Sequence, residues 1–285
     1  MARENRDLVV GCVADATRTY LDQAHRLLLS WRWFAGEWAQ ADFHVCVVER
    51  VAAADHLRFE RLGAKVHLVP GFTDRHPTSN KIRFFDIEPA RTADRLLLLD
   101  CDTIVVQPPG ALFRAAGLSA KIVDSATVSL DVFARLFASY GAPIPAAAHI
   151  CTVTHAPTIA YFNTGVIALT RAAADVLAPA WERINAELAP RFEALGGEAH
   201  YCEQASLSLA VALTGTPYST FGNELNFPAH FQYLPLDCEF ANVDPTIIHY
   251  HGLVGENSLL LPSKYPNVNR RIQDFNLRMK SHGSA

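Results

Sequence analysis

The sequence has no pair of cysteines at the Cys-x-x-Cys spacing, and no apolar run approaches the ~18 residues that a membrane-spanning helix needs. The first absence argues against a zinc knuckle or a disulfide framework. The second predicts that the chain has no transmembrane segment. Its six cysteines are scattered, and we expect them to be reduced and mostly buried.

A strong excess of charge of one sign is also missing. The 25 basic residues face 29 acidic ones, which gives a formal net charge of -4 and no electrostatic reason to expect a nucleic-acid partner. Charged residues 1–6 run directly into a strand-like segment and leave no room for a signal peptide, so we expect a cytoplasmic protein. The chain contains no repeat and no low-complexity linker. With 285 residues that are 50% hydrophobic, one domain spanning 1–285 with a sizeable core is expected.

Short apolar runs alternate with segments of helical periodicity in the first half of the chain. The predicted strands are Leu8–Ala14, Phe43–Val48, Val66–Val69 and Arg95–Val106, and the predicted helices are Thr17–Phe34, Ala52–Leu62 and Asn80–Glu88. Continuous apolar strands are typical of a parallel sheet covered on both faces, so we expect an α/β fold. Ligands of such sheets bind at the carboxyl ends of the strands.

The second half is rich in loops. Residues 123–157 predict a helical or irregular insertion. They are followed by an expected strand at Thr164–Leu169, a helical stretch at Ala172–Leu195 with breaks at Pro179 and Pro190, a helix at Glu203–Leu213 and a last helix near Asn269–Met279.

The fourth predicted strand carries two carboxylates one residue apart, Asp100 and Asp102. Alternate residues of a strand point to the same side, so both carboxylates could reach one Mg²⁺ or Mn²⁺ ion. His249 ends another apolar stretch and is a candidate third ligand, since imidazole binds manganese. The alternatives are carboxylates that only end a strand and a hydrogen-bonded core histidine.

Seven short motifs occur in a characteristic order: Ala14-Asp15, Lys81-Ile82-Arg83, Leu99-Asp100-Cys101-Asp102, Tyr161-Phe162-Asn163-Thr164-Gly165-Val166, Glu203-Gln204, Asn226-Phe227 and His249-Tyr250-His251-Gly252. As an ordered set, they resemble the nucleotide-diphospho-sugar glycosyltransferases of the GT-A fold, and in particular glycosyltransferase family 8, the glycogenin and lipopolysaccharide galactosyltransferase group. The resemblance implies a Rossmann-like, mostly parallel central sheet flanked by helices. It also implies a nucleotide-binding half at 1–106 and an acceptor-side half with a C-terminal tail at 107–285.

The resemblance further implies a retaining transfer of a hexose from a nucleotide-diphosphate sugar, with UDP as the expected nucleotide, to a hydroxyl acceptor, with Mn²⁺ or Mg²⁺ as cofactor. The donor-binding residues that it implies are Ala14, Asp15, Lys81, Arg83, Asp100, Cys101, Asp102, Asp124, Asn163 and Gly252. The implied catalytic residues are Gln204, Glu203 and Asn163, and the implied metal ligands are Asp100, Asp102 and His249.

Several of these residues have a second interpretation. Asp15 could accept a hydrogen bond from a uracil imide or cap the following helix. Lys81 could assist with the diphosphate charge, but a surface lysine is the simpler expectation, whereas Arg83 matches an arginine that approaches the donor. Glutamine is no strong base, so Gln204 would stabilise charge or orient the acceptor while Glu203 binds sugar hydroxyls, unless the pair only begins a helix.

The sequence departs from the family pattern in one place. The family follows its His-x-x-Gly with a nearby lysine that contacts the leaving diphosphate, but here the next lysine is Lys264. Either Lys264 reaches the site, or Lys81, Arg83 and the metal carry the phosphate charge without it. This departure leaves open a catalytically weakened sugar-nucleotide-binding module.

A haloacid-dehalogenase-type phosphatase is a further alternative, because its nucleophile motif is also a strand ending in Asp-x-Asp. That motif normally lies on the first strand, whereas here it lies on the fourth. The sequence does not identify the acceptor, whose site we expect residues 149–155 and the tail after Gly252 to shape.

Overall fold

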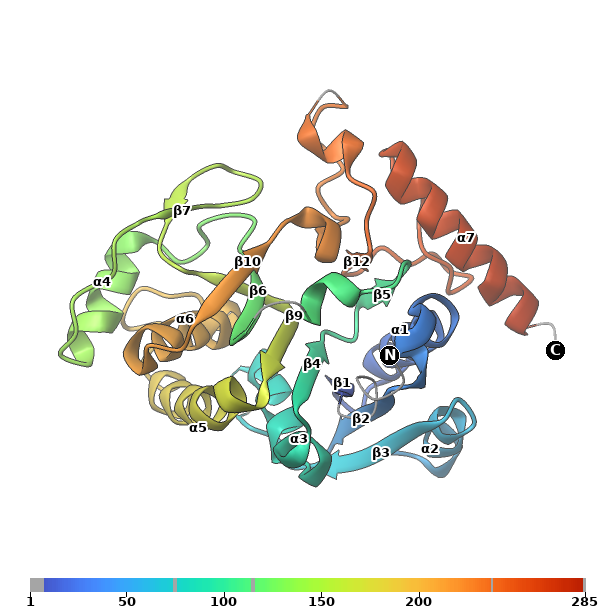
Figure 1. Ribbon diagram of the computed structural model, residues 1–285, viewed down its shortest axis with the longest axis horizontal. Coiled ribbons are helices and arrows are strands. Elements are labelled where there is room, and N and C mark those ends of the chain that lie inside the picture. Colours follow the sequence, from blue (N-terminus) through green and yellow to red (C-terminus); the bar gives the residue numbers. More distant parts are fainter. Residues whose placement is uncertain (1–7, 74–75, 114–115, 237, 284–285) are drawn as a thin grey trace.

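A seven-stranded sheet forms the centre of the protein (Figure 1). The computed structural model describes residues 8–73, 76–113, 116–236 and 238–283. In spatial order the strands of the sheet are β10 (Tyr218–Phe221), β6 (Leu118–Ile122), β9 (Phe162–Thr170), β4 (Arg95–Leu99), β1 (Leu8–Ala14), β2 (Asp42–Val48) and β3 (Ala64–Val69). All neighbours pair in parallel except β9, which runs antiparallel to both β6 and β4. The sheet is therefore mostly parallel, as the sequence predicts.

Helices cover both faces of this sheet. The α-helices are α1 (Arg18–Phe34), α2 (Ala53–Glu60), α3 (Glu88–Thr92), α4 (Leu130–Ser139), α5 (Arg171–Leu188), α6 (Cys202–Thr214) and α7 (Pro266–Gly283). The short 3-10 helices are η1 (Gly36–Gln40), η2 (Pro77–Asp86), η3 (Gly110–Phe113), η4 (Ala199–Tyr201), η5 (Asn223–Leu225) and η6 (Glu239–Asn242). None of the helices in the described ranges combines the length and apolar character needed to cross a bilayer.

The apolar run of β4 explains why both faces are covered. Successive residues of a strand point to opposite faces, so Leu96 and Leu98 enter one core while Leu97 and Leu99 enter the other. The first core contains the buried faces of α4, α5 and α6, and the second contains the buried face of α1. Each face buries leucines, which accounts for the lack of a polar alternation in the sequence.

A second, three-stranded sheet joins distant parts of the chain beside the central one. It consists of β11 (Phe227–Pro228), β12 (Ile247–His249) and β5 (Thr103–Val105), and β12 pairs antiparallel with β5. The last helix, α7, buries Val268, Ile272 and Phe275 in the third core with this sheet and lies at the periphery of the molecule (Figure 1). A two-stranded sheet of β7 (His149–Ile150) and β8 (Pro157–Thr158) lies within the predicted insertion.

Three expected elements differ in the structure. The strand predicted over residues 95–106 is two strands, β4 and β5, because a turn at residues 100–102 carries the chain into the second sheet. The helix predicted at 80–88 is the 3-10 helix η2 followed by α3. Residues 79–82 of η2 are all buried, polar and apolar alike, so this segment lacks the single apolar face of a surface α-helix. Helix α5 continues through Pro179, where packing of its flanking residues outweighs the lost backbone hydrogen bond.

The cysteines agree with the expectation. All six are free, five of them are buried and Cys238 is half-buried.

Candidate functional site

A cavity of about 530 Å³ opens at the carboxyl ends of β1 and β4. Its wall comes from both halves of the chain, from residues near the amino end to residues beyond β12. The predicted site residues that line it are Asp15, Lys81, Asp100, Cys101, Asp102, Asp124, Asn163, Glu203, Gln204 and His249. Most of the predicted site therefore meets in one place.

The turn between β4 and β5 holds the carboxylate pair. The backbone N–H of Asp100 donates to Gly165 O, and the carbonyl of Asp100 accepts from both the N–H and the hydroxyl of Thr103. The carbonyl of Asp102 accepts from the N–H of Tyr250. These hydrogen bonds fix the turn that carries both carboxylates. The two residues lie between β4 and β5, so the side-chain alternation of a single strand, which the sequence argument assumed, does not place them.

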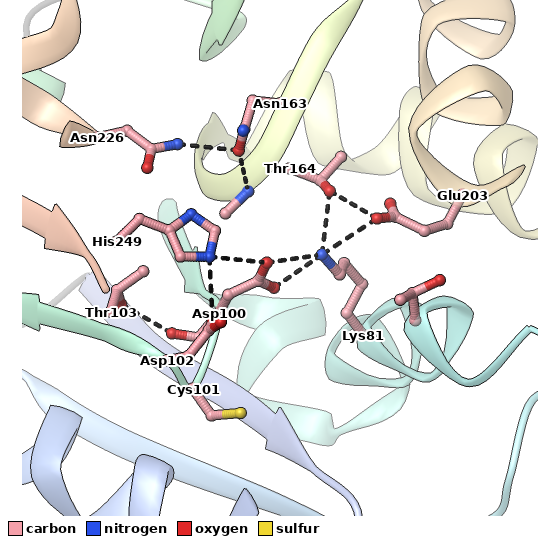
Figure 2. A network of polar contacts seen from close by, with 12 residues as sticks. Lys81, Asp100, Cys101, Asp102, Thr103, Asn163, Thr164, Glu203, Asn226 and His249 are labelled. Carbon is pink, nitrogen blue, oxygen red and sulfur yellow. Dashed lines mark hydrogen bonds and ion pairs between the residues drawn. The ribbon is translucent and has the colours of Figure 1, made fainter. Parts of the chain in front are cut away.

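His249 reaches this turn because β12 pairs with β5, in a register that sets His249 opposite Thr103. Its Nε2 lies 3.0 Å from Asp102 Oδ1 and 4.0 Å from Asp100 Oδ2 (Figure 2). Burial alone would lower the pKa of His249, but the charge of Asp102 and their hydrogen bond outweigh burial and raise it. The same histidine lowers the pKa of Asp102 against the opposing effect of burial. The pair is therefore a carboxylate and an imidazole held in hydrogen-bond contact.

Gly165 lies directly against the His249 ring. A Cβ at this position would be 2.6 Å from both Nδ1 and Cε1 of His249. The backbone N–H of Gly165 also donates to the side-chain oxygen of Asn163. The glycine of the Asn-Thr-Gly segment is therefore explained by the space that the imidazole occupies.

Lys81 lies at the centre of a second network (Figure 2). Its Nζ is 2.7 Å from Asp100 Oδ1, 3.2 Å from Glu203 Oε1 and 3.0 Å from Thr164 Oγ1. Burial by itself would lower its pKa, but the two carboxylates raise it, so the amine is charged. Lys81 is only 8% exposed, so the expectation of a surface lysine is wrong.

Glu203 completes that network from the first turn of α6. It is 1% exposed, and its Oε1 accepts a hydrogen bond from the hydroxyl of Thr164 at 2.7 Å. Burial raises the pKa of Glu203, while the charge of Lys81 opposes the rise. Its Oε2 is buried and has no hydrogen-bond partner in the part of the chain that the structure describes. This suits a ligand hydroxyl, since a buried acceptor without a donor is costly.

A third network fixes Asp124 and Asn163. Lys121 is fully buried and donates to Asp124 Oδ1 at 2.6 Å and to the backbone oxygen of Asn226 at 2.8 Å. Asn163 donates to Asp124 Oδ2 at 3.4 Å and accepts from the amide of Asn226 at 3.0 Å. Burial lowers the pKa of Lys121 against the pull of Asp124. These contacts hold the amide and the carboxylate rigidly at the cavity wall.

Asp15 has a partner that the sequence did not indicate. The side-chain amide of Asn80 donates to Asp15 Oδ1 at 2.9 Å, and its oxygen accepts from the N–H of Phe72 at 2.7 Å. Asp15 gives no side-chain cap to α1, whose first residue is Arg18. Its carboxylate is thus oriented by η2 at the cavity wall.

Four residues considered from the sequence lie outside this cavity lining. Ala14 is buried in the core beneath it, and Gly252 is not part of the wall. Arg83 pairs with Asp86 and Glu182, at 3.0 Å each. The fourth, Lys264, donates to the backbone oxygen of residue 234 on the surface.

His251 lines the cavity beside the carboxylates, although the sequence assigned it no role. Its Nδ1 is 3.7 Å from Asp102 Oδ2, and its ring stacks on His249 with centroids 4.0 Å apart. The potential ligand atoms of Asp102, His249 and His251 all lie within 4.8 Å of one another. Two histidines one residue apart at a strand end are the signal that could have indicated it. Carboxylate oxygens beside imidazole nitrogens suit a divalent transition metal, so these residues fit such an ion.

Comparisons with known proteins give the family and the fold of the chain. The Rhodobacterales glycosyltransferase domain model matches residues 12–215. A comparison with curated proteins gives no match.

Solved structures show the same fold at low sequence identity. The galactosyltransferase LgtC in complex with donor and acceptor sugar analogues is similar at a TM-score of 0.60 and 14% identity, over 95% of this chain and 95% of that one. GlyE from Streptococcus pneumoniae TIGR4 is similar at 0.52 and 15% identity over 94% of this chain, which spans 60% of the GlyE chain. Mouse xyloside xylosyltransferase 1 is similar at a TM-score of 0.52 and 13% identity, over 89% of this chain and 99% of that one. These similarities establish the GT-A fold. The family model is that of a glycosyltransferase domain and argues against the phosphatase alternative.

Proposed function

Because the chain belongs to the Rhodobacterales glycosyltransferase domain family, we propose that it transfers a hexose from a nucleotide-diphosphate sugar, most simply a UDP-hexose, to a hydroxyl acceptor. The observation that carries this proposal is the meeting of Asp100, Asp102, His249 and Lys81 in one cavity at the carboxyl ends of the strands. Paired carboxylates and a buried cation are what a metal-bound diphosphate requires. The enzyme class comes from the family, and the donor and metal dependence are our proposal.

Asp100, Asp102 and His249 would hold Mn²⁺ or Mg²⁺. Such an ion, when bound, neutralises the charge that develops on the departing diphosphate. Lys81 adds a fixed positive charge beside Asp100, held by Glu203 and Thr164. In the resembled family, a lysine shortly after the His-x-x-Gly motif contacts the leaving diphosphate. This chain has no lysine directly after Gly252, and we assign that role to Lys81.

The nucleobase would lie next to Asp15. Its carboxylate is an acceptor only, and Asn80 already occupies Oδ1, so Oδ2 remains for a base N–H. A uracil imide offers one such donor. The hexose would lie toward Asn163 and Glu203, where an amide and an unpartnered carboxylate oxygen suit sugar hydroxyls.

The cavity favours retention of the anomeric configuration. Inverting transfer needs a free carboxylate to take the acceptor proton. Each carboxylate among the described lining residues has a partner on at least one oxygen: Asp15 with Asn80, Asp100 with Lys81, Asp102 with His249, Asp124 with Lys121 and Glu203 with Lys81. The oxygens proposed above to bind the donor, Asp15 Oδ2 and Glu203 Oε2, would face the nucleobase and the hexose. Gln204 carries no basic group. We therefore propose that the leaving phosphate takes the proton and that the acceptor attacks from the same face.

The decisive experiment measures hydrolysis of a panel of nucleotide sugars with Mn²⁺, with Mg²⁺ and with EDTA. We expect a UDP-hexose to be turned over only when metal is present, and the Asp102→Asn variant to lose that turnover. Turnover that EDTA leaves unchanged, or an unimpaired variant, would overturn the metal assignment. Proton NMR of the first-formed sugar product reports its anomeric configuration and tests retention.

The cell compartment is a lesser part of the proposal. The free, mostly buried cysteines suit a reducing environment, and we propose a cytoplasmic location.

A further inference from the structure

His251 occupies an unusual position at the edge of the cavity. Its backbone has φ +52°, in the left-handed region that residues other than glycine rarely adopt. Such strain persists where surrounding contacts determine it, often at functional sites. Here the N–H of Tyr250 is bound to the carbonyl of Asp102, and Leu253 N–H closes a turn on Tyr250. The chain thus turns so that a second imidazole faces the carboxylate pair.

The two imidazoles approach opposite oxygens of one carboxylate. His249 Nε2 lies 3.0 Å from Asp102 Oδ1, and His251 Nδ1 lies 3.7 Å from Asp102 Oδ2. Asp100, by contrast, is engaged with Lys81 at 2.7 Å and is 4.0 Å from His249. Among the described residues, the potential ligand atoms of Asp102, His249 and His251 all lie within 4.8 Å of one another. Asp100 lies beside this group and is paired with Lys81.

We propose that His251 is an additional ligand of the metal ion and that it makes this site select Mn²⁺ or Co²⁺ over Mg²⁺. This inference rests on the proposed metal-dependent function. Mg²⁺ prefers an octahedron of oxygen ligands, whereas imidazole nitrogen favours the transition metals, and a second imidazole adds to that preference. A site with oxygen ligands and a single imidazole would discriminate less strongly between Mn²⁺ and Mg²⁺.

The side chain of His251 has the freedom that this role needs. The ring is stacked on His249 with 17° between the planes, so binding one ion with both rings requires the His251 ring to turn. Its side chain is 37% exposed at the cavity, while that of His249 is 7% exposed. His230 packs edge-on against His251, with centroids 4.2 Å apart, so a turn of the His251 ring also changes this contact. His249 thus serves as the fixed ligand and His251 as the adjustable one.

The test counts imidazole ligands on bound Mn²⁺ directly. Pulsed EPR of the purified protein with Mn²⁺ alone, and with Mn²⁺ and UDP, should detect two coupled ¹⁴N nuclei in the wild type and one in the His251→Asn variant. Isothermal titration should show that wild type binds Mn²⁺ more tightly than Mg²⁺, and that H251N lowers Mn²⁺ affinity about tenfold or more while changing Mg²⁺ affinity little.

Two further variants make the result specific. His200→Asn changes another cavity-lining histidine and should keep both nitrogen couplings and the metal preference. Asp102→Asn should weaken both metals. If H251N retains two ¹⁴N couplings and the wild-type ratio of Mn²⁺ to Mg²⁺ affinity, His251 is not a ligand. If D102N loses metal binding in the same experiment, the proposed function stands. If wild type binds neither metal, both proposals fail.

Discussion

At the residue scale, Gly165 controls the position of the histidine ligand. An alanine there would place its Cβ 2.6 Å from the His249 ring, closer than real contacts allow, so we expect Gly165→Ala to displace the ring. Isothermal titration should show a loss of Mn²⁺ affinity of about tenfold or more, because the metal ligand loses its orientation. Gly71→Ala is the matched control, since its nearest neighbour is at 3.6 Å and its backbone is unstrained. Equal affinities for both variants would show that His249 tolerates the shift.

The buried charges of Lys81, Asp100 and Glu203 predict a measurable coupling. Lys81→Met leaves two carboxylates facing each other, and we expect the free energy of unfolding at pH 7 to fall by about 3 kcal/mol. Adding Glu203→Gln removes one of those charges, so the double variant should recover part of the loss. Urea unfolding of the wild type, both single variants and the double variant completes the cycle. Additive changes would mean that Lys81 and Glu203 do not stabilise each other.

Much of the candidate site could be predicted at this scale, and the exceptions have physical reasons. Asp100, Asp102 and His249 meet as expected, because polar residues that end buried strands gather at one edge of the sheet. The burial of Lys81 could not be predicted, since its two counter-charges are 19 and 122 residues away along the chain. Arg83 lies on the same short helix, but it faces Glu182.

At the element scale, single-sequence periodicity identified the strands but not where one sheet gives way to another. The apolar run from Leu96 to Val106 predicts one strand, because both β4 and β5 are buried. The break at the carboxylates depends on Gly165 of β9 and on Tyr250, the residue after β12, whose backbone groups hydrogen-bond to Asp100 and Asp102. Tertiary contacts of this kind leave no local signal in the sequence.

The β2–β3 pair contains a histidine couple, buried His44 and half-buried His67, that predicts a pH dependence of stability. His44 Nδ1 and His67 Nε2 lie 2.8 Å apart, and burial, then the charges of His67 and Lys65, lower the pKa of His44 from 6.5 to about 4. The unfolded chain therefore binds more protons between these values. Neutral His44 therefore makes its full contribution to the free energy of unfolding above pH 6.5. This contribution falls as the pH decreases and is lost by about pH 4.

We expect this loss to amount to about 2 kcal/mol between pH 7 and pH 5. Urea unfolding at the two pH values measures the free energy of unfolding. From pH 7 to pH 5 this free energy should fall by about 2 kcal/mol less for His44→Leu than for the wild type. His56→Asn, on the exposed face of α2, is the control and should behave like the wild type. Identical decreases for His44→Leu and the wild type would refute the role of His44.

At the scale of the whole molecule, the cavity joins segments that are far apart in the chain. The family model ends at residue 215, yet His249 and His251 lie beyond it and reach the site through β12. Ligand binding should therefore stabilise both halves together, and we propose that the chain unfolds as one domain. A single thermal transition that shifts as a unit is the expected behaviour.

Metal and nucleotide should act together on that transition. Two carboxylates and imidazoles leave part of the shell of a metal ion unfilled, so the diphosphate of UDP should complete it and each ligand should strengthen binding of the other. At concentrations about 100-fold above its dissociation constant, a ligand adds about 2.7 kcal/mol to the free energy of unfolding. We therefore expect Mn²⁺ and UDP together to raise the melting temperature by roughly 5 °C or more. This combined shift should exceed the sum of the shifts that each ligand causes alone. Differential scanning calorimetry measures this shift. EDTA or Asp102→Asn should remove the excess, and an equal shift by UDP in EDTA would show that the nucleotide binds without the metal.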